Sequence, residues 1–375
     1  MIRCQYNLIK ADLAKKMVFL TGPRQVGKTW LAKTLMQDYK HPLYLNYDTP
    51  ADLQIITKRS WSRETDLIVF DEIHKMKKWK NYLKGLFDDK PKMLHILVTG
   101  SARLDTFRHS GDSLVGRFFL HRLLPFSLAE LHQPTQENEV RLMSQGGFPE
   151  PFLAASDDDA DRWRMQYVQG LIRFDLLDFE RVHDLRTVQA TLDILRRSVG
   201  SAVSYRSIAE DLSIAPNTVK KYIQIFEDLF IIFRVTPHSK SIRQSLKKEP
   251  KLYFYDTGMV VGDEGAKFEN YVAVSLYKQL LMYEDKKGKE ARLHYLKIKQ
   301  GGEVDFCLVV NNEVLHIVEA KLSDRTLHRG LKYFSEKYKM RGYQVVGHGQ
   351  VTPHELGDVK VVSSFEYLKA VPGLG

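Results

Sequence analysis

Residues 22–29, GPRQVGKT, fit the pattern G-x-x-x-x-G-K-[ST]. The apolar stretch MVFLTG (17–22) before them predicts a buried strand, and a helix is expected from about Lys28 to Gln37. The two glycines let the backbone curl so that successive N–H groups face phosphate oxygens, and the helix N-terminus adds a favourable partial charge. This setting predicts a phosphate-binding loop for ATP, formed by Gly22, Pro23, Arg24, Gln25, Val26, Gly27, Lys28, Thr29 and Trp30.

Two side chains of this loop have specific expected roles. Lys28 would reach the β- and γ-phosphates, and the Thr29 hydroxyl would hold Mg²⁺. The buried strand expected in DLIVFDE (66–72), which overlaps the motif IVFDEIH (68–74), carries Asp71 and Glu72 at its carboxyl end, where ligands bind in open α/β sheets. Asp71 is expected to bind the Mg²⁺ through its water or to orient Thr29, and Glu72 to polarise the attacking water as a base. A strand that ends in two solvated acids is the alternative.

Two further apolar stretches, PLYLNYD (42–48) and MLHILVTGS (93–101), complete a predicted parallel sheet that is covered on both faces. The second of them ends in Thr99-Gly100-Ser101. A polar residue here, Ser101, would hydrogen-bond the γ-phosphate or the attacking water. A turn that merely ends the strand would have the same sequence.

Three arginines follow this strand, Arg103, Arg117 and Arg122. An arginine from one subunit can stabilise transition-state charge at the nucleotide of its neighbour. Arg117, in Val-Gly-Arg, is the candidate for this role, and a plain surface arginine is the alternative. The prediction implies a homo-oligomer, such as a hexameric ring.

The composition is that of a globular protein with a basic balance. A length of 375 residues predicts two or three domains, and 43% hydrophobic and 27% charged residues are ordinary values. No apolar run approaches a membrane span, the N-terminus lacks the pattern of a secretory signal, and two cysteines, Cys4 and Cys307, exclude a disulfide framework. A cytoplasmic protein without a membrane partner is therefore expected. The net charge of +10 and the pI near 9.2 favour a polyanionic partner or an acidic surface.

The middle of the chain predicts a helical region followed by a winged helix. After a mainly helical stretch at 126–189, residues 205–235 give two helices separated by a turn at Ala215-Pro216, and then a strand in LFIIFRV. Six basic residues between Arg234 and Lys251 favour DNA as the partner, although winged helices also bind proteins. The second helix opens with groups able to meet phosphates or base edges, namely Pro216, Asn217, Thr218, Lys220 and Lys221.

The motifs GPRQVGKT, IVFDEIH, VTGSARLD and SLVGRFFLHRLLPFSLAEL together resemble the prokaryotic AAA-type ATPases of the archaeal ATPase group. The resemblance continues through GGFPEP, TVKKYIQIFEDLFII, KLYFYDTGM, FENYV and GGEVDF, and so covers nearly the whole chain. It implies nucleotide hydrolysis by the core, with a winged helix and a tail of unassigned function after it.

A second group of charged residues lies in the last third of the chain. Glu269 is on a predicted helix, Asp305 is on a strand in GGEVDF, and Glu319 and Lys321 end the next strand, VLHIVEAK. This order resembles the core of the PD-(D/E)XK nucleases. The resemblance implies that Asp305 and Glu319 bind Mg²⁺, that Glu269 completes the metal shell and that Lys321 orients or activates water. Glu303 could replace one of these ligands, and such a fold can also lose its chemistry while keeping a DNA-binding shape.

The predicted fold class is α/β in three parts. They are a P-loop NTPase core with a parallel sheet at 1–130, a helical lid and winged-helix module at 131–250, and an α/β restriction-endonuclease-like domain at 251–375. The favoured function is an ATP- and Mg²⁺-dependent ATPase that binds and processes DNA. Branched DNA such as a Holliday junction is a candidate substrate by analogy of fold. The alternatives are a nucleotide-dependent switch that binds a protein partner and a nuclease regulated by ATP.

Overall fold

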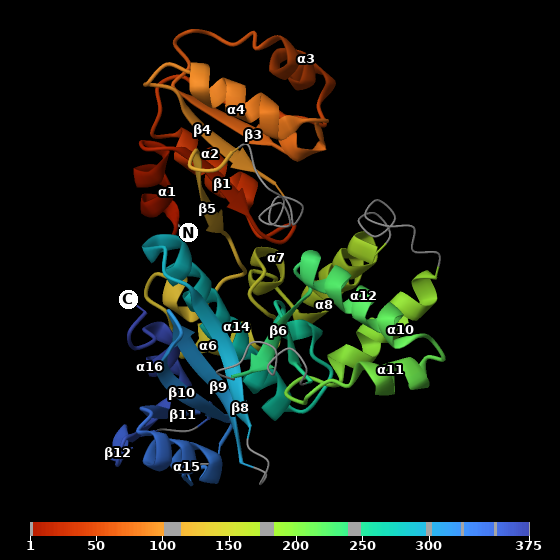
Figure 1. The fold of residues 1–375 in the computed structure, drawn as a ribbon, viewed down its shortest axis with the longest axis vertical. Helices are drawn as coiled ribbons and strands as arrows, with labels where there is room; N and C mark the ends of the chain where they lie inside the picture. Colours follow the sequence, from red (N-terminus) through yellow and green to blue (C-terminus); the bar gives the residue numbers. More distant parts are fainter. Residues whose placement is uncertain are drawn as a thin grey trace. The chain divides into compact units, whose positions relative to one another are not determined.

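The computed structural model describes residues 3–100, 114–172, 184–238, 249–297, 302–323, 326–348 and 351–374. The chain forms two compact units, Met1–Leu124 and Pro125–Gly375, each with its own sheet (Figure 1). Among the described helices, none combines the length and the apolar composition that crossing a membrane requires.

The first unit is built on a five-stranded parallel sheet. Its strands are β1 (Met17–Thr21), β2 (Pro42–Asn46), β3 (Leu67–Asp71), β4 (His95–Thr99) and β5 (Phe118–Arg122), in the order β2-β3-β4-β1-β5. β1 and β3 are buried along their whole length because they lie inside the sheet and are covered on both faces. β2, an edge strand, is mostly half-buried.

Side chains alternate between the two faces of this sheet, and helices cover each face (Figure 1). Met17 and Phe19 join a buried cluster with residues of α3 (Pro50–Lys58) and α4 (Trp79–Asp89). The other face packs against α1 (Tyr6–Leu13) and α2 (Lys28–Met36). Because both faces of the sheet are covered, successive residues of its strands are apolar.

The predicted α/β fold class with a parallel core is confirmed. The four strands expected at 17–22, 42–48, 66–72 and 93–101 each contain an observed strand, and α2 begins at Lys28 as expected. β5 is not expected from the sequence, because FFLHR is short and ends in two polar residues.

The second unit begins with helices. Their polar caps follow the usual preferences: Thr135 forms a capping box with Asn138, and Ser156 accepts from the N–H of Asp159. The acidic run that starts at Ser156 thus opens a helix, where its charge complements the helix dipole. The helices are η3 (Leu128–Glu130), α6 (Gln136–Ser144), α7 (Pro149–Phe152), α8 (Asp157–Gly170), α10 (Leu185–Arg196), α11 (Tyr205–Asp211) and α12 (Pro216–Asp228).

Helices α11 and α12 lie on either side of the expected turn at Ala215-Pro216. The apolar face of α12 is buried, as its spacing predicts, through Val219, Tyr222, Ile223 and Phe226. The strand after them, β6 (Ile232–Pro237), pairs antiparallel with β7 (Lys251–Phe254) and parallel with β8 (Ala291–Lys297). It belongs to a larger sheet rather than to a separate wing, and the winged-helix module stays a prediction.

That larger sheet has eight strands in the order β12-β13-β11-β10-β9-β8-β6-β7. Its other strands are β9 (Glu303–Val310), β10 (Glu313–Lys321), β11 (Gly342–Val346), β12 (His354–Leu356) and β13 (Val359–Ser363). α14 (Glu264–Lys287) and α15 (Arg329–Tyr338) pack against it, and α16 (Ser364–Lys369) follows β13. Because β6 and β7 pair across residue 250, the expected boundary there falls inside one compact unit. The division into three domains stays a prediction.

A buried ion pair ties η3 to α14. The ammonium of Lys278 contacts the carboxylate of Glu130 and donates to the carbonyl oxygen of Pro125 at 2.6 Å. The two side chains are 2% and 1% exposed. Either charge would lack water if its partner were removed, and an uncompensated buried charge is costly.

Replacing Lys278 by Ala should therefore lower the free energy of unfolding by about 3–5 kcal/mol, because Glu130 is left buried and unpaired. Chemical denaturation followed by circular dichroism measures the change. The control is Lys332→Ala, which breaks the exposed pair between Lys332 and Glu336 (3.9 Å). That control should cost less than about 1 kcal/mol, and equal losses in the two variants would contradict the role of the buried pair.

Candidate functional site

The carboxyl ends of β1, β3 and β4 meet at one edge of the first sheet. β4 lies between β1 and β3, and the register pairs Thr99 with both Asp71 and Leu20. The loop at 22–29 leaves β1 at this edge and leads into α2. Strand order therefore brings the expected phosphate loop next to Asp71 and Glu72, at the edge where open α/β sheets bind ligands.

Two glycines give the loop its shape. Gly22 has a φ of 143°, and a Cβ there would lie 2.0 Å from the carbonyl oxygen of Leu123. Gly27 has a φ of 95° and immediately precedes α2. The buried guanidinium of Arg3 supports the loop by donating to the carbonyl oxygen of Val26 at 2.9 Å. Sequence reasoning missed Arg3, because no local pattern links it to the loop.

The side chain of Lys28 is held by the loop itself. Its Nζ donates to the carbonyl oxygens of Gly22 at 2.9 Å and Pro23 at 2.6 Å. Burial lowers the pKa of Lys28 to about 8, and the charges of Glu72 and Asp71 oppose this shift. Neutral carbonyls thus hold the ammonium at a position where an entering phosphate oxygen can replace them.

Asp71 is buried and accepts hydrogen bonds from three other elements. The hydroxyl of Thr99 donates to it at 2.7 Å, that of Thr29 at 3.3 Å, and that of Tyr44 at a short distance. Burial is the main cause that raises the pKa of Tyr44, and the hydrogen bond to Asp71 raises it further. The oxygens of Thr29 and Asp71 suit a hard divalent cation and fit the Mg²⁺ that a P-loop ATPase implies. The sequence does not point to Tyr44, because it meets Asp71 only when β2 pairs with β3.

Glu72 follows β3 in a left-handed backbone conformation, with a φ of 57°. Its N–H donates to the carbonyl oxygen of Thr99 at 3.1 Å. Its carboxylate lies 3.5 Å from Nε2 of His74 and 3.6 Å from Nζ of Lys75. Burial raises the pKa of Glu72, and the charge of Lys75 opposes the rise. A carboxylate with a raised pKa suits a general base, and His74 is a neighbour that the sequence did not flag.

The remaining expected nucleotide-site residues differ in exposure. Val26 is buried, Arg24 and Gln25 are exposed, and Trp30 is 48% exposed. Ser101 lies outside the described residues, so its expected contact with the γ-phosphate stays a prediction.

Arg117 lies at the opposite edge of the sheet from the phosphate loop. It directly precedes β5, which runs parallel to β1 with Phe118 beside Met17. Its guanidinium makes two hydrogen bonds to the carboxylate of Asp88, at 2.8 and 3.0 Å. Arg117 is therefore not part of the nucleotide site of its own chain, and its expected action on a neighbouring subunit stays a prediction. Arg103 lies outside the described residues.

The second unit brings the four expected tail residues into one cluster. The N–H of Asp305 lies 3.4 Å from Oε2 of Glu319, and Nζ of Lys321 lies 2.8 Å from Oε1 of the same carboxylate. Glu269 joins them through Lys251, whose Nζ lies 3.3 Å from Glu269 and 3.3 Å from Asp305. Sequence reasoning missed Lys251, which looks like one more member of a basic stretch.

The oxygens expected to hold Mg²⁺ in this cluster already accept from protein donors. Oδ2 of Asp305 accepts from the N–H of Ala320 at 3.1 Å, and Oε1 of Glu319 lies 3.1 Å from Nδ1 of His328 in addition to Lys321. In the part of the chain that the structure describes, no group of three or more His, Cys, Asp or Glu side chains is arranged to hold a metal ion. The donor set does not fit a metal, and the metal roles expected for Asp305 and Glu319 gain no support and remain predictions.

Three domain families match consecutive parts of the chain. An AAA domain matches residues 14–132, a domain of unknown function (DUF8612) matches residues 136–265, and another domain of unknown function (DUF4143) matches residues 264–367. The first match contains the phosphate loop, Asp71 and Glu72. Residues 14–132 therefore form a P-loop ATPase domain of AAA type, a kind of domain that binds and hydrolyses nucleoside triphosphates.

Curated relatives are distant. An uncharacterized protein of Mycobacterium tuberculosis is 26% identical over 246 residues, which cover 65% of this chain and 55% of that protein. An uncharacterized protein of Haemophilus influenzae is 23% identical over 363 residues, which cover 85% of this chain and 86% of that protein. The chain thus spans about half the length of the mycobacterial relative.

The solved structures that resemble this chain do so with low TM-scores and low sequence identity. The Walker-type ATPase of Pyrococcus abyssi has a TM-score of 0.43 and 14% identity, with 68% of this chain and 93% of that chain covered. The Holliday junction branch migration motor RuvB of Thermotoga maritima has a TM-score of 0.32 and 16% identity, with 65% and 93% covered. At these TM-scores the likenesses carry no argument about function.

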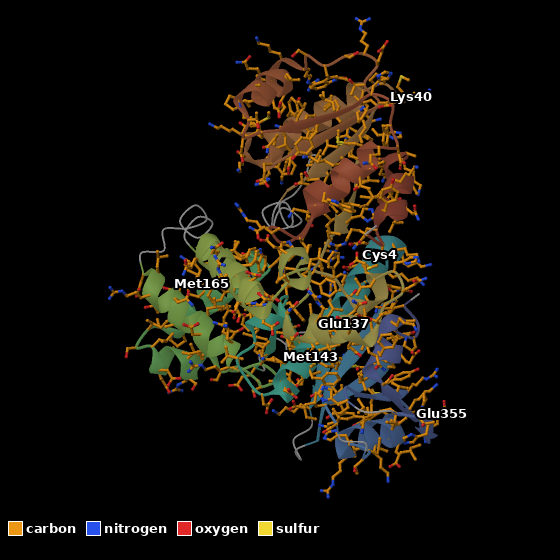
Figure 2. All side chains as sticks on the ribbon, turned by 180° about the vertical axis from the view of Figure 1, so that it is seen from behind. Cys4, Lys40, Glu137, Met143, Met165 and Glu355 are labelled. Carbon is orange, nitrogen blue, oxygen red and sulfur yellow. The ribbon has the colours of Figure 1, made fainter. Side chains whose placement is uncertain are left out.

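The lowered pKa of Lys28 predicts that nucleotide affinity depends on pH. Below about pH 8 the ammonium is charged in the free protein, and above it the charge that attracts phosphate is lost. The affinity for Mg²⁺-ATP should therefore fall as the pH rises through about 8, measured by binding of a fluorescent ATP analogue. Lys28→Met should bind more weakly with a flat profile. Lys40→Met, which changes an exposed lysine (Figure 2), should keep the wild-type profile. A wild-type affinity that is constant across this range would contradict the role of Lys28.

Replacing Glu72 by Gln should leave nucleotide binding intact and slow ATP hydrolysis by roughly 10²–10⁴-fold, because an amide cannot accept the proton of the attacking water. Phosphate release at saturating ATP measures the rate. The exposed Glu64, replaced by Gln, is the control and should retain the wild-type rate. Hydrolysis at the wild-type rate by the Glu72 variant would exclude this residue as the base.

Proposed function

We propose that this chain is an ATP-dependent DNA-processing protein. ATP hydrolysis at residues 22–29 would drive work on DNA by the residues that follow the first unit. The observation that carries the proposal is the convergence of Lys28, Thr29, Asp71 and Glu72 at one sheet edge. Branched DNA, such as a Holliday junction, is the substrate class to which the proposal extends.

Each residue at this edge has one task in hydrolysis. The loop N–H groups and Lys28 bind and orient the triphosphate. Thr29 and Asp71 would hold Mg²⁺, which when bound neutralises charge on the β- and γ-phosphates. Glu72, with its raised pKa, accepts a proton from the attacking water. Thr99 keeps the Asp71 carboxylate in one orientation through its 2.7 Å hydrogen bond.

The exposed face of α12 supports DNA as the partner. Pro216, Asn217, Lys220 and Lys221 are exposed near its start, while its opposite face is buried. Basic and amide side chains at the start of a helix can contact phosphates and base edges, as they do in helix-turn-helix proteins. The net charge of +10 adds an attraction to DNA that weakens with salt.

Assembly into a homo-oligomeric ring is part of the proposal. Arg117 is partly exposed and is paired with the exposed Asp88. Exposed ion pairs are weak, so this pair can be exchanged for a stronger partner at little cost. A neighbour's γ-phosphate is such a partner, because charge-assisted bonds from Arg to phosphate are strong.

DNA should accelerate ATP hydrolysis, with duplex, single-stranded and four-way-junction DNA tested as separate arms. DNA affinity, measured by fluorescence anisotropy, should fall as salt rises. Replacing both Lys220 and Lys221 by Glu should weaken DNA binding and abolish the acceleration, while the rate without DNA is unchanged. The matched control replaces both Lys286 and Lys287, an exposed adjacent pair on α14, by Glu and should keep both properties.

If no DNA binds at low salt and none accelerates hydrolysis, the DNA proposal fails. A nucleotide-dependent switch that binds a protein partner is then the account to test.

A further inference from the structure

Lys251 lies among acidic side chains inside the second unit. It is the first residue of β7 and is only 1% exposed. A buried ammonium has lost its water, so it remains charged only where carboxylates and hydrogen-bond acceptors replace that water. The carboxylates around Lys251 replace the water that its ammonium has lost.

The ammonium of Lys251 has one carboxylate for each of its donors. A lysine ammonium carries three N–H groups. Its Nζ lies 2.8 Å from Oε1 of Glu303, 3.3 Å from Oε1 of Glu269 and 3.3 Å from Oδ1 of Asp305. Glu303 and Asp305 belong to β9 and Glu269 belongs to α14, so the ammonium joins three elements.

Other protein donors also contact these carboxylates. The hydroxyl of Tyr253 donates to Oε1 of Glu269 at 2.7 Å. Nζ of Lys297 lies 3.3 Å from Oε2 of Glu303. A backbone N–H, that of Ala320, donates to Oδ2 of Asp305 at 3.1 Å. The carboxylates are therefore oriented toward protein donors.

Gly200 closes a further side of the cluster. Its φ is 80°, and a Cβ at this position would lie 2.7 Å from Oε2 of Glu269. The backbone therefore approaches this carboxylate so closely that it leaves no room for a side chain. Mg²⁺ usually keeps several of its water molecules, and such a hydrated ion needs more space than a side chain does.

Lys251 and the neighbouring carboxylates each shift the pKa of the other. Burial alone would lower the pKa of Lys251, but Glu269, Asp305 and Glu303 raise it above its ordinary value. Burial, Glu269 and Glu319 raise the pKa of Asp305, and Lys251 opposes this rise. The positive charge of Nζ, within 3.3 Å of all three carboxylates, offsets part of their mutual repulsion.

We propose that the ammonium of Lys251 is the resident cation of the cluster formed by Glu269, Glu303 and Asp305, in the place of a divalent metal ion. The cluster is a metal-free structural centre that joins β7, β9 and α14. The unit carries acidic residues of the kind that nucleases use, but it does not bind the metal that would activate a water molecule. Phosphodiester bonds are not cut at this cluster.

The test is the dependence of thermal stability on Mn²⁺, measured on the nucleotide-free full chain in Mn²⁺ and in EDTA. In EDTA the midpoint of Lys251→Ala should lie several degrees below that of the wild type, because three acids lose their cation. In Mn²⁺ that midpoint should rise by more than the wild-type midpoint, since the vacated position can now bind the ion. Lys297→Met, which removes a neighbouring lysine but keeps Lys251, should respond to Mn²⁺ as the wild type does.

Two results would overturn the proposal. One is a rise of the wild-type midpoint in Mn²⁺ that Asp305→Asn abolishes. The other is a folded Lys251→Ala chain whose midpoint responds to Mn²⁺ no more than the wild type does. If that variant does not fold, Fe²⁺ and peroxide on the wild-type chain decide, because bound Fe²⁺ cuts the nearby backbone. No cuts within residues 303–321 support the proposal, and cuts there refute it.

Discussion

The hydrogen bonds to Asp71 hold the proposed nucleotide site together. Thr99 donates to one carboxylate oxygen, and Thr29 and Tyr44 donate to the other. These residues belong to β4, α2 and β2, so a single carboxylate at the end of β3 joins four elements. The arrangement requires β4 to lie between β1 and β3. The chemistry of the site is therefore a consequence of strand order as well as of the residues.

Contiguous patterns predicted the phosphate loop, the Asp71-Glu72 pair and most core strands, because glycine spacing and apolar runs act locally. The contacts of Arg3, Tyr44 and Lys251 could not be predicted, since each meets its partners only through packing between distant segments. The metal site expected in the last third of the chain shows most clearly what local sequence patterns cannot predict. Its acidic residues are visible in the sequence, whereas the lysine that neutralises them looks like part of a basic stretch. The order of the eight-stranded sheet was likewise beyond local patterns.

Two lysines, Lys28 and Lys251, show how the surroundings of an ammonium group decide its role. Lys28 contacts two neutral carbonyl oxygens, and a charged phosphate is a stronger partner for it. Replacing the carbonyl contacts of Lys28 by a contact with phosphate is therefore favourable, and Lys28 can bind a ligand. Lys251 already faces three carboxylates, so an incoming anion offers it no stronger partner and would be repelled by the acids. The first lysine is suited to binding and the second to a fixed structural role.

The central claim is that the loop at residues 22–29 is the nucleotide site and that Lys28 changes partners when ATP binds. A crystal structure of the chain with Mg²⁺ and a non-hydrolysable ATP analogue tests it most directly. In this structure Nζ of Lys28 should leave the carbonyl oxygens of Gly22 and Pro23 and contact the β- and γ-phosphates, with Thr29 beside the metal. A nucleotide bound elsewhere, with Lys28 still on both carbonyls, would contradict it.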